Sequence, residues 1–292
     1  MLSDAQWEMV EELLPRRTGR KGRPFSDPRQ MLEGILYRLR AGIAWRDLPA
    51  CFGSWQTVYT WHNRMAKDGT WDVILQRLLT QADTEDLIDW SVSVDSTITR
   101  AHQHATNITR VTGGFVELQQ PAGRSADHAV GRSRGGLSTK VHALVDGHGM
   151  PLTMIVTAGH RGDCPVLIPL SKRLRVPGTV GRPRTRPDEL RADRAYASKA
   201  VRRYLREHKI TATIPEKKDV IAARKRKGSK GGRPPTFDAQ SYKGRNVVER
   251  FFGNLKQWRG VATRYDKLAV VYRAGVMAIA VMTWLKKLSD TP

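Results

Sequence analysis

The stretch that decides the fold is Tyr242 to Lys256, which reads YKGRNVVERFFGNLK. Arg245, Glu249 and Lys256 follow Tyr242 by three, seven and fourteen residues. On a helix with 3.6 residues per turn, these spacings align all four side chains along one polar stripe. The spacing therefore predicts a helix that holds Glu249 on a supported face, with an apolar body formed by Val247, Val248, Phe251, Phe252 and Leu255.

This polar stripe has two interpretations. The first is an amphipathic surface helix in which Arg245 and Glu249 form an ordinary ion pair at four-residue spacing. The second is a site for metal and phosphate, because a carboxylate fixed between two cations and a phenol suits both ligands. The rest of the chain decides between them.

The composition favours a polyanionic partner. The 292 residues include 50 Lys and Arg against 28 Asp and Glu, a formal net charge of +22, and such a balance is typical of nucleic-acid-binding proteins. An anionic membrane surface is the alternative. However, the longest apolar run, Ala274 to Leu285, is shorter than the roughly twenty residues of a spanning helix. We expect a buried helix there and no membrane partner.

The ends and the cysteines predict a cytoplasmic protein. The N-terminal sequence MLSDAQWEMVEELL lacks the basic start, apolar stretch and cleavage site of a secretory signal. Cys51 and Cys164 are far apart and show no paired metal spacing, which argues against a zinc finger or a disulfide framework. A bacterial cytoplasmic location is expected, with association to the nucleoid when the protein is bound to DNA.

The first 85 residues read as a series of short helices. Ser3 and Gln6 form a capping box at the start of one helix. Asp27, placed before Pro28, begins a second helix. A basic loop at residues 16–23 lies between them. We expect the tryptophans of this region to form its core: Trp7, Trp45, Trp55, Trp61 and Trp71.

Part of this region resembles a helix-turn-helix. A short helix at residues 45–52 and a break at Gly53 precede a helix that begins after Ser54 and closes at Gly69. In that motif the second helix enters the major groove. The alternative is a small helical bundle with a solvated face. The net charge and the basic loop favour DNA reading by the polar side chains on one face, Gln56, Thr60, Asn63 and Lys67.

The middle of the chain reads as strands and helices. Residues 91–100, SVSVDSTITR, alternate as a strand does, and Asp95 is disfavoured among β-branched residues unless its carboxylate gains a ligand such as a metal. Residues 137–159 predict a hairpin around Asp146-Gly147. Residues 190–193 and 210–214 predict two more strands. We expect one helix after Asp163, which can cap it, and a second helix that runs up to His208.

The spacing Tyr, two residues, Arg, three residues, Glu, six residues, Lys resembles the C-terminal signature of bacterial insertion-sequence transposases of the DDE type. The sequences VDST, ADRAY and YKGRNVVERFFGNLK each look like those of the family. In this resemblance, which spans about residues 90 to 260, Asp95, Asp193 and Glu249 match the three catalytic acids. One departure is Ala197, where relatives often carry an acidic residue after the tyrosine of the second motif.

The resemblance implies an α/β fold with a ribonuclease H-like mixed sheet of about five strands and flanking helices. An all-α, helix-turn-helix-like domain at residues 1–85 would precede a catalytic domain at residues 90–288. It also implies a transposase that binds element ends and catalyses metal-dependent DNA cleavage and strand transfer. Asp95, Asp193 and Glu249 would hold two Mg²⁺ ions, for which Mn²⁺ may substitute.

The implied partner is double-stranded DNA, both the element ends and the target, bound by a homodimer or a higher oligomer. Tyr242, Arg245 and Lys256 would contact its phosphates. Two alternatives stay open: a catalytically silent, transposase-derived DNA-binding protein such as a repressor, and a general nuclease of the same fold.

Two further features bear on DNA binding. Residues 216–236 are rich in Lys, Arg, Gly and Pro and predict a mobile basic loop that contacts phosphates. The loop has no Trp to stack on a flipped base, so cleavage through a DNA hairpin is not expected. His102 and His104 share a strand spacing, and we expect contact with DNA or with the Asp95 site rather than with zinc.

Overall fold

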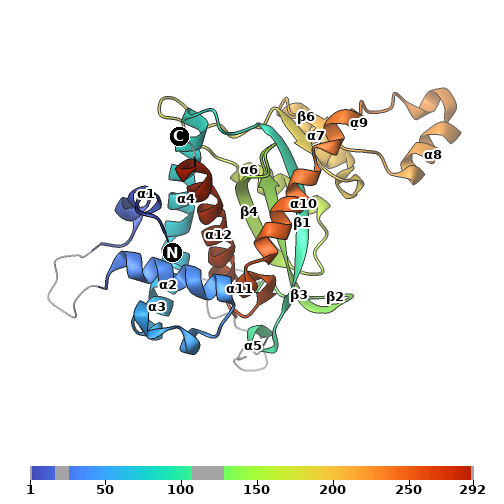
Figure 1. Ribbon diagram of the computed structural model, residues 1–292. Helices are drawn as coiled ribbons and strands as arrows, with labels where there is room; N and C mark the ends of the chain where they lie inside the picture. The colour runs from blue at the N-terminus through green and yellow to red at the C-terminus, as the bar shows by residue number, and fades with distance from the viewer. Residues whose placement is uncertain (1, 17–25, 107–127, 291–292) are drawn as a thin grey trace.

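A mixed β-sheet lies at the centre of the protein, in a computed structural model that describes residues 2–16, 26–106 and 128–290 (Figure 1). Strands β4, β3 and β1 are antiparallel neighbours, and β5 and β6 continue the sheet parallel to β1. Two short strands, β2 and β7, pair with β3 and β1. The strands are β1 Ser91–Ala101, β2 Gly131–Ser133, β3 Gly136–Val145, β4 Pro151–Ala158, β5 Glu189–Arg191, β6 Thr211–Thr213 and β7 Thr263–Arg264.

Five of the strands lie in the order β4-β3-β1-β5-β6, which confirms the predicted ribonuclease H-like α/β fold with flanking helices. The helices of the described chain are α1 Asp4–Glu8, α2 Pro28–Ala41, α3 Trp55–Asp68, α4 Thr70–Thr84, α5 Gln103–Thr106, α6 Cys164–Arg173, α7 Lys199–Glu207, α8 Lys218–Arg226, α9 Ala239–Lys243, α10 Asn246–Lys256, α11 Arg259–Ala262 and α12 Ala269–Ser289.

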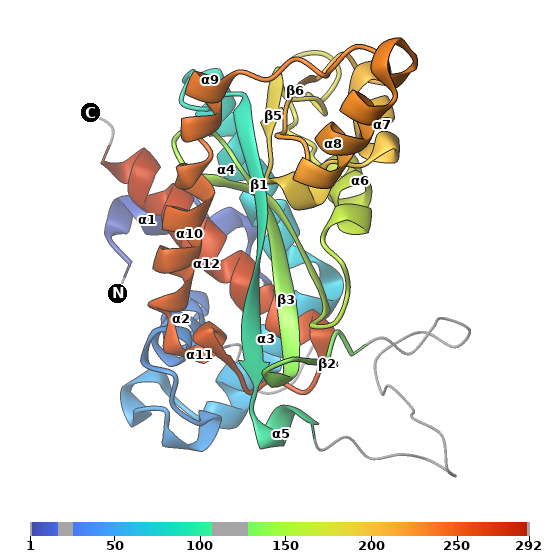
Figure 2. The ribbon, with the colours of Figure 1, turned by 90° about the vertical axis from the view of Figure 1, so that its right-hand side faces the viewer.

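Strand β1 is covered on both faces. Helix α10 packs on β1 and β3 from one side, and α6 packs on β3 and β4 from the other (Figure 2). The face opposite Val92 and Val94 is therefore buried as well, with Ser93 fully buried and Thr97 9% exposed. Small hydroxyl side chains allow helices to approach this face. The alternation of apolar and polar residues along β1 therefore does not leave its polar face exposed to solvent.

The N-terminal helices begin and end largely as predicted. The Ser3–Gln6 capping box is present in both directions, and the Asp27 side chain accepts bonds from the first-turn backbone of α2. Ser54 differs, because its hydroxyl donates to Gln56 Oε1 at 2.6 Å instead of capping α3. Most of the predicted basic loop, residues 17–23, lies outside the described residues.

Helix α12 is the apolar helix at the centre of the core. It contacts α3 and α4 on one side and β4 on the other, and Trp284 Nε1 donates to the Pro151 carbonyl at 2.7 Å. By length and composition α12 could cross a membrane, but 72% of its apolar window is buried inside the structure. The predicted buried helix at Ala274 to Leu285 is confirmed.

The N-terminal helices and the sheet share one hydrophobic core through α12. Buried residues form a single cluster that runs from Leu2 to Leu288. Arg273 of α12 binds Asp72 of α4 through two nitrogens, at 2.9 and 2.5 Å. A boundary between residues 85 and 90 remains a prediction about domain organisation, and any separate N-terminal domain packs against the C-terminal helix.

The predicted basic loop at residues 216–236 is only partly a loop. Residues Lys218–Arg226 form α8, which projects from the body of the molecule (Figure 1). Arg224 Nη1 forms an ion pair with Glu216 Oε2 at 2.6 Å and so ties the helix to its own entry. The residues Val220 to Ala223 are compatible with a helix. The prediction of a loop considered only the many Lys and Arg side chains around them.

The hairpin between β3 and β4 turns over a longer loop than Asp146-Gly147 alone. Five residues, Asp146 to Met150, lie between the paired Val145 and Pro151, and Gly149 takes the left-handed conformation at φ +89°. Asp146 is fully buried, and its Oδ1 accepts the backbone N–H groups of His148 and Met150 at 2.9 and 2.7 Å. The carboxylate therefore organises the turn.

Burial raises the pKa of Asp146 from 3.8 to about 6, although backbone N–H bonds oppose that shift. Because the folded pKa exceeds the unfolded one, ionisation costs stability progressively from about pH 4 to pH 6 and fully above it. We expect Asp146→Asn, which keeps an accepting oxygen, to be more stable than the parent protein at pH 8 by about 2 kcal/mol. The advantage should vanish near pH 4, as urea unfolding at both pH values would measure; a pH-independent difference would contradict it.

Candidate active site

Asp95 and Asp193 are brought together by the register of two neighbouring parallel strands. Ser93 of β1 pairs with Arg191 of β5, and each aspartate follows its partner of that pair by two residues. The negative charge of Asp193 acts on the Asp95 carboxyl. Asp193 begins a short 3₁₀ turn, and its Oδ1 accepts the Ala195 N–H at 2.8 Å.

Glu249 reaches the same place from helix α10, and Arg245 links it to Asp95. The Arg245 guanidinium donates from Nη1 to Asp95 Oδ2 at 2.9 Å and from Nη2 to Glu249 Oε1 at 2.5 Å. The Arg245 and Asp95 side chains are 15% and 26% exposed, whereas that of Glu249 is 55% exposed. One fork-shaped cation therefore holds two carboxylates from distant parts of the chain.

The stretch that we predicted as one helix is broken in the structure. Helix α9 ends at Lys243, Gly244 follows, and Arg245 stands at the start of α10. A Cβ on Gly244 would lie 2.5 Å from Arg191 Nη1, so glycine allows β5 to approach the break. The apolar body of α10 is buried as predicted: Val247, Val248, Phe251, Phe252 and Leu255.

The other two residues of the signature lie at different distances from the carboxylates. Tyr242 stands on α9, and the Arg245 guanidinium lies 6.0 Å from its ring centroid. Lys256 is exposed at the end of α10, seven residues after Glu249 and so about 10 Å further along the helix. Tyr242 therefore borders the site, while Lys256 faces solvent beyond it.

Burial raises the pKa of the Asp95 carboxyl, and the charge of Asp193 acts in the same direction. The Ser96 N–H, which donates to Asp95 Oδ1 at 2.8 Å, and Arg245 oppose this rise. Burial beside these carboxylates also raises the pKa of the Tyr196 phenol. Tyr196 is 1% exposed, and its hydroxyl finds no hydrogen-bond partner among the described residues.

A network behind β1 was missed in the sequence. Ser96 Oγ donates to Asp163 Oδ1 at 2.8 Å, and Lys140 Nζ binds the same oxygen at 2.9 Å. Asp163 makes no side-chain cap on α6, contrary to our expectation. The cross-strand register, which pairs Ser96 with His142, is the signal that places Lys140 and Ser96 on one face. This network fixes the strand immediately after Asp95.

The predicted DNA-reading residues stay on α3, which lies towards the opposite end of β1 from α9 (Figures 1 and 2). Gln56, Thr60 and Lys67 are exposed, whereas Asn63 is half-buried. Thr60 Oγ1 donates to the Gln56 carbonyl of its own helix at 2.7 Å. The structure thus presents Gln56 and Lys67 more openly than Asn63.

His102 and His104 do not reach the Asp95 site. Seven residues of strand separate Asp95 from His102, which corresponds to about 23 Å. The His102 ring instead packs against Tyr265, with centroids 4.8 Å apart. Expected contact of these histidines with the Asp95 site is therefore wrong.

The donor set fits divalent metal ions of the oxygen-binding kind, because Arg245 links the carboxylates of Asp95 and Glu249 and the charge of Asp193 acts on Asp95. No cluster of three His, Cys, Asp or Glu side chains with ligand spacing occurs within residues 2–16, 26–106 and 128–290. Arg245 forms ion pairs with both Asp95 and Glu249, so its positive charge stands between these two carboxylates.

Two known families match the sequence of this chain. Residues 89–284 match the family described as "Transposase DDE domain". The chain belongs to the DDE transposase family. Residues 2–75 match a second family, described as "Putative transposase of IS4/5 family", so the N-terminal helices of this transposase also have family relatives.

Relatives of this transposase occur in other bacteria. The "Putative transposase for insertion sequence element IS6501" of Brucella ovis is 32% identical over 154 residues, which cover 51% of this chain and all of that protein. The "Uncharacterized protein y4sN" of Sinorhizobium fredii is 38% identical over 113 residues, covering 39% of this chain and 86% of that protein.

Among solved structures, the Mos1 strand transfer complex aligns over 86% of this chain and 82% of the Mos1 chain. The sequence identity is 13% and the TM-score is 0.25, and at this TM-score the likeness carries no argument.

Proposed function

We propose that this transposase cuts DNA at the ends of an insertion sequence and joins the cut ends to target DNA, with Asp95, Asp193 and Glu249 as its catalytic acids. The observation that carries the proposal is the convergence of three carboxylates from three elements. The register of β1 and β5 brings Asp95 and Asp193 together, and Arg245 links Glu249 to Asp95. The net charge of +22 supports a DNA substrate.

Asp95, Asp193 and Glu249 would hold two Mg²⁺ ions through their carboxylate oxygens. Bound there, two Mg²⁺ or Mn²⁺ ions supply activation of an attacking oxygen and stabilisation of a leaving oxygen. The chain itself supplies the oxygen ligands on rigid elements and excludes solvent from one side of Asp95, whose side chain is 26% exposed. Deprotonated Asp95 is required, since only the carboxylate binds a hard cation.

The reaction consists of two in-line displacements at phosphorus. Water attacks the phosphorus at the element end, the bond to the 3′ oxygen of that end breaks, and the 3′ oxygen leaves as a hydroxyl. This hydroxyl then attacks a phosphorus of target DNA and displaces its 3′ oxygen. Neither displacement requires a covalent bond to the protein.

Arg245 is the residue that changes partner in this proposal. If metal ions balanced the charge of the carboxylates, the Arg245 guanidinium would be free to donate to a phosphate, for which its planar fork is suited. Tyr242, which borders Arg245, and Lys256, further along α10, extend a phosphate-binding path. Lys217 and Lys218 line a hollow of about 510 Å³ together with Asp193, so α8 adds two cations beside the site.

We assign sequence-specific contacts to the exposed face of α3, with Gln56, Thr60 and Lys67 at the DNA and Asn63 contributing from its half-buried position. The distance along β1 between α3 and the carboxylates suits a duplex that runs from a recognition site to a cleavage site. A dimer or higher oligomer would hold two ends together, acting in the cytoplasm on nucleoid DNA.

The test uses purified protein and an end-labelled duplex that carries the inverted repeat from the DNA flanking the gene. With Mg²⁺ we expect strand cleavage at the repeat terminus that leaves a 3′-hydroxyl, and transfer of this end into plasmid DNA. Cleavage should stop in EDTA. Specific binding without any cleavage in Mg²⁺ or Mn²⁺ would instead favour a catalytically silent DNA-binding protein, and cleavage without preference for the repeat would favour a general nuclease.

A further inference from the structure

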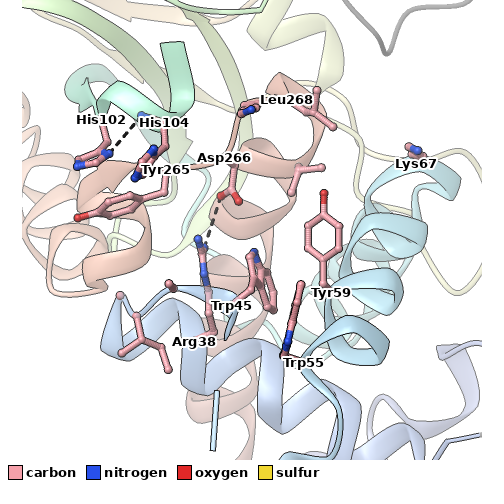
Figure 3. Close-up of a pocket in the computed structure, with 15 residues that line it drawn as sticks. Arg38, Trp45, Trp55, Tyr59, Lys67, His102, His104, Tyr265, Asp266 and Leu268 are labelled. Atoms are coloured by element: carbon pink, nitrogen blue, oxygen red, sulfur yellow. Dashed lines mark hydrogen bonds and ion pairs between the residues drawn. The ribbon is translucent and has the colours of Figure 1, made fainter. Parts of the chain in front are cut away.

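A cavity lined by aromatic and charged side chains lies away from the three carboxylates. It has a volume of about 810 Å³ and opens between α3, the turn after α2, the end of β1 and the start of α12 (Figure 3). This volume falls in the range of sites that hold small molecules. The mechanism proposed above uses only Lys67 among its lining residues.

Aromatic rings form the walls of the cavity. Trp45, Trp55 and Tyr59 come from the N-terminal helices, and Tyr265, from the segment before α12, lines the opposite side beside His102 and His104 (Figure 3). The Trp45 and Tyr59 rings meet edge to face, with centroids 5.4 Å apart. Trp55 and Tyr265 are only half-buried. Flat, accessible rings of this kind can stack on a planar group.

A buried ion pair supplies hydrogen-bonding groups at the cavity. Arg38 is 2% exposed and Asp266 8% exposed, and Arg38 Nη1 lies 3.5 Å from Asp266 Oδ2, beyond a good hydrogen bond. Arg38 Nε and Nη1 have no hydrogen-bond partner among the described residues. Unfilled donors beside a carboxylate are costly when left unpaired. Arg38 and Asp266 therefore offer donor and acceptor groups to a planar polar ligand.

Cationic side chains line the outer part of the cavity. Lys67 and Lys267 are exposed there, and His104 of α5 lines the side of the cavity opposite Lys67 (Figure 3). A ligand with a planar, polar ring system and an attached anionic group would fit the cavity. The ring system would lie at the aromatic inner part, and the anionic group would lie at the cationic outer part. A nucleotide of DNA has this composition, with a base that stacks on aromatic rings and a phosphate that binds cations.

We propose that this cavity receives one unstacked nucleotide of the element-end DNA, with its base stacked on Trp55 and its phosphates at Lys67 and Lys267. The proposal rests on the function proposed above and adds a nucleotide site to it. Arg38 and Asp266 bind the exposed edge of the base.

The test scans single mismatches through a 40-bp duplex that carries the flanking inverted repeat, with binding measured in EDTA. A mismatch removes part of the cost of unstacking a base, so it strengthens binding where the protein extracts that base. We expect tightening of about tenfold at one position, and its loss in Trp55→Ala. Trp55→Phe should keep most of the gain, because it retains a stacking ring.

Trp258→Ala is the matched control. Trp258 is also half-buried under an arginine, with the Arg40 guanidinium 5.5 Å from its ring as Arg46 is 6.0 Å from Trp55, but it lies outside the cavity. This variant should keep the full mismatch gain. Thermal unfolding of each variant shows whether it is folded. Equal tightening in Trp55→Ala and the parent protein would overturn the proposal.

A second readout needs no variant. A 5-iododeoxyuridine placed at the sensitive position should crosslink under ultraviolet light to a peptide containing Trp55, Tyr59 or Tyr265, as mass spectrometry identifies. Crosslinks confined to other peptides, or no sensitive position in a protein that cleaves the repeat, would overturn the nucleotide site alone. Absence of both repeat binding and cleavage would overturn the proposed function as well.

Discussion

Asp95→Asn is expected to lower Mg²⁺-dependent cleavage of the inverted-repeat duplex on the order of a thousandfold or more, while binding to that duplex survives. Asp95 stands between the other two acids: Asp193 follows it in strand register, and Glu249 shares Arg245 with it. An amide keeps the size of the side chain and can still accept the Ser96 N–H, so the fold should remain. Its neutral oxygen is a much weaker ligand for Mg²⁺ than a carboxylate.

The measurement compares initial cleavage rates and equilibrium binding for Asp95→Asn, Asp193→Asn and Glu249→Gln. Asp188→Asn is the matched control, because Asp188 has a 76% exposed side chain paired with Arg184 just before β5. It changes charge equally and should leave cleavage within a few-fold of the parent. An Asp95→Asn protein that cleaves at the parent rate would refute the assignment of the catalytic acids.

Arg245→Gln is expected to strengthen divalent-ion binding in the absence of DNA by about tenfold, while it weakens cleavage by a similar or larger factor. The two effects have one origin. In the structure the guanidinium neutralises Asp95 and Glu249, so it competes with a cation for the same carboxylates. Its loss leaves three carboxylates without that counter-charge, but also removes a donor for the phosphate.

Calorimetric titration with Mn²⁺ and Mg²⁺ measures the first effect, and cleavage at saturating metal measures the second. Added metal should also raise the unfolding temperature more for Arg245→Gln than for the parent, since a ligand that binds the folded state stabilises it. Arg245→Lys keeps the charge and should show little gain in metal affinity. Unchanged or weaker metal binding in Arg245→Gln would mean that the guanidinium does not oppose the metal.

Much of the fold could be predicted because local patterns and tertiary packing agree. The capping box at Ser3, the apolar run of α12 and the β3–β4 hairpin each follow from residue type and spacing. The three acids were found because a resemblance joined three short motifs that are individually weak. Even Asp95 gave a local signal, as a charge within a β-branched strand.

Other features could not be read from local patterns. The periodicity of residues 242–256 concealed the break at Gly244, which depends on Arg191 from another strand. High charge concealed helix α8. Asp163 was interpreted as a helix cap, whereas its carboxylate binds Ser96 and Lys140 across the sheet. For Gly244 and Asp163, the residue that decides the local structure is more than twenty positions away in the sequence. For α8, the surrounding Lys and Arg residues conceal the few residues that favour a helix.

The sequence by itself determined the α/β class, the order of the strands, the apolar faces of the helices and the excess of positive charge, since these depend on residue type and short spacings. Only the tertiary structure decided that Arg245 forks between Asp95 and Glu249, and that Arg38, Trp55 and Tyr265 line one cavity. The physical reason is that these arrangements depend on residues far apart in the chain: Asp95 and Arg245 are 150 positions apart, and the cavity brings Arg38 and Trp55 together with Tyr265. Their distance is set by strand register and helix packing, which no local pattern contains.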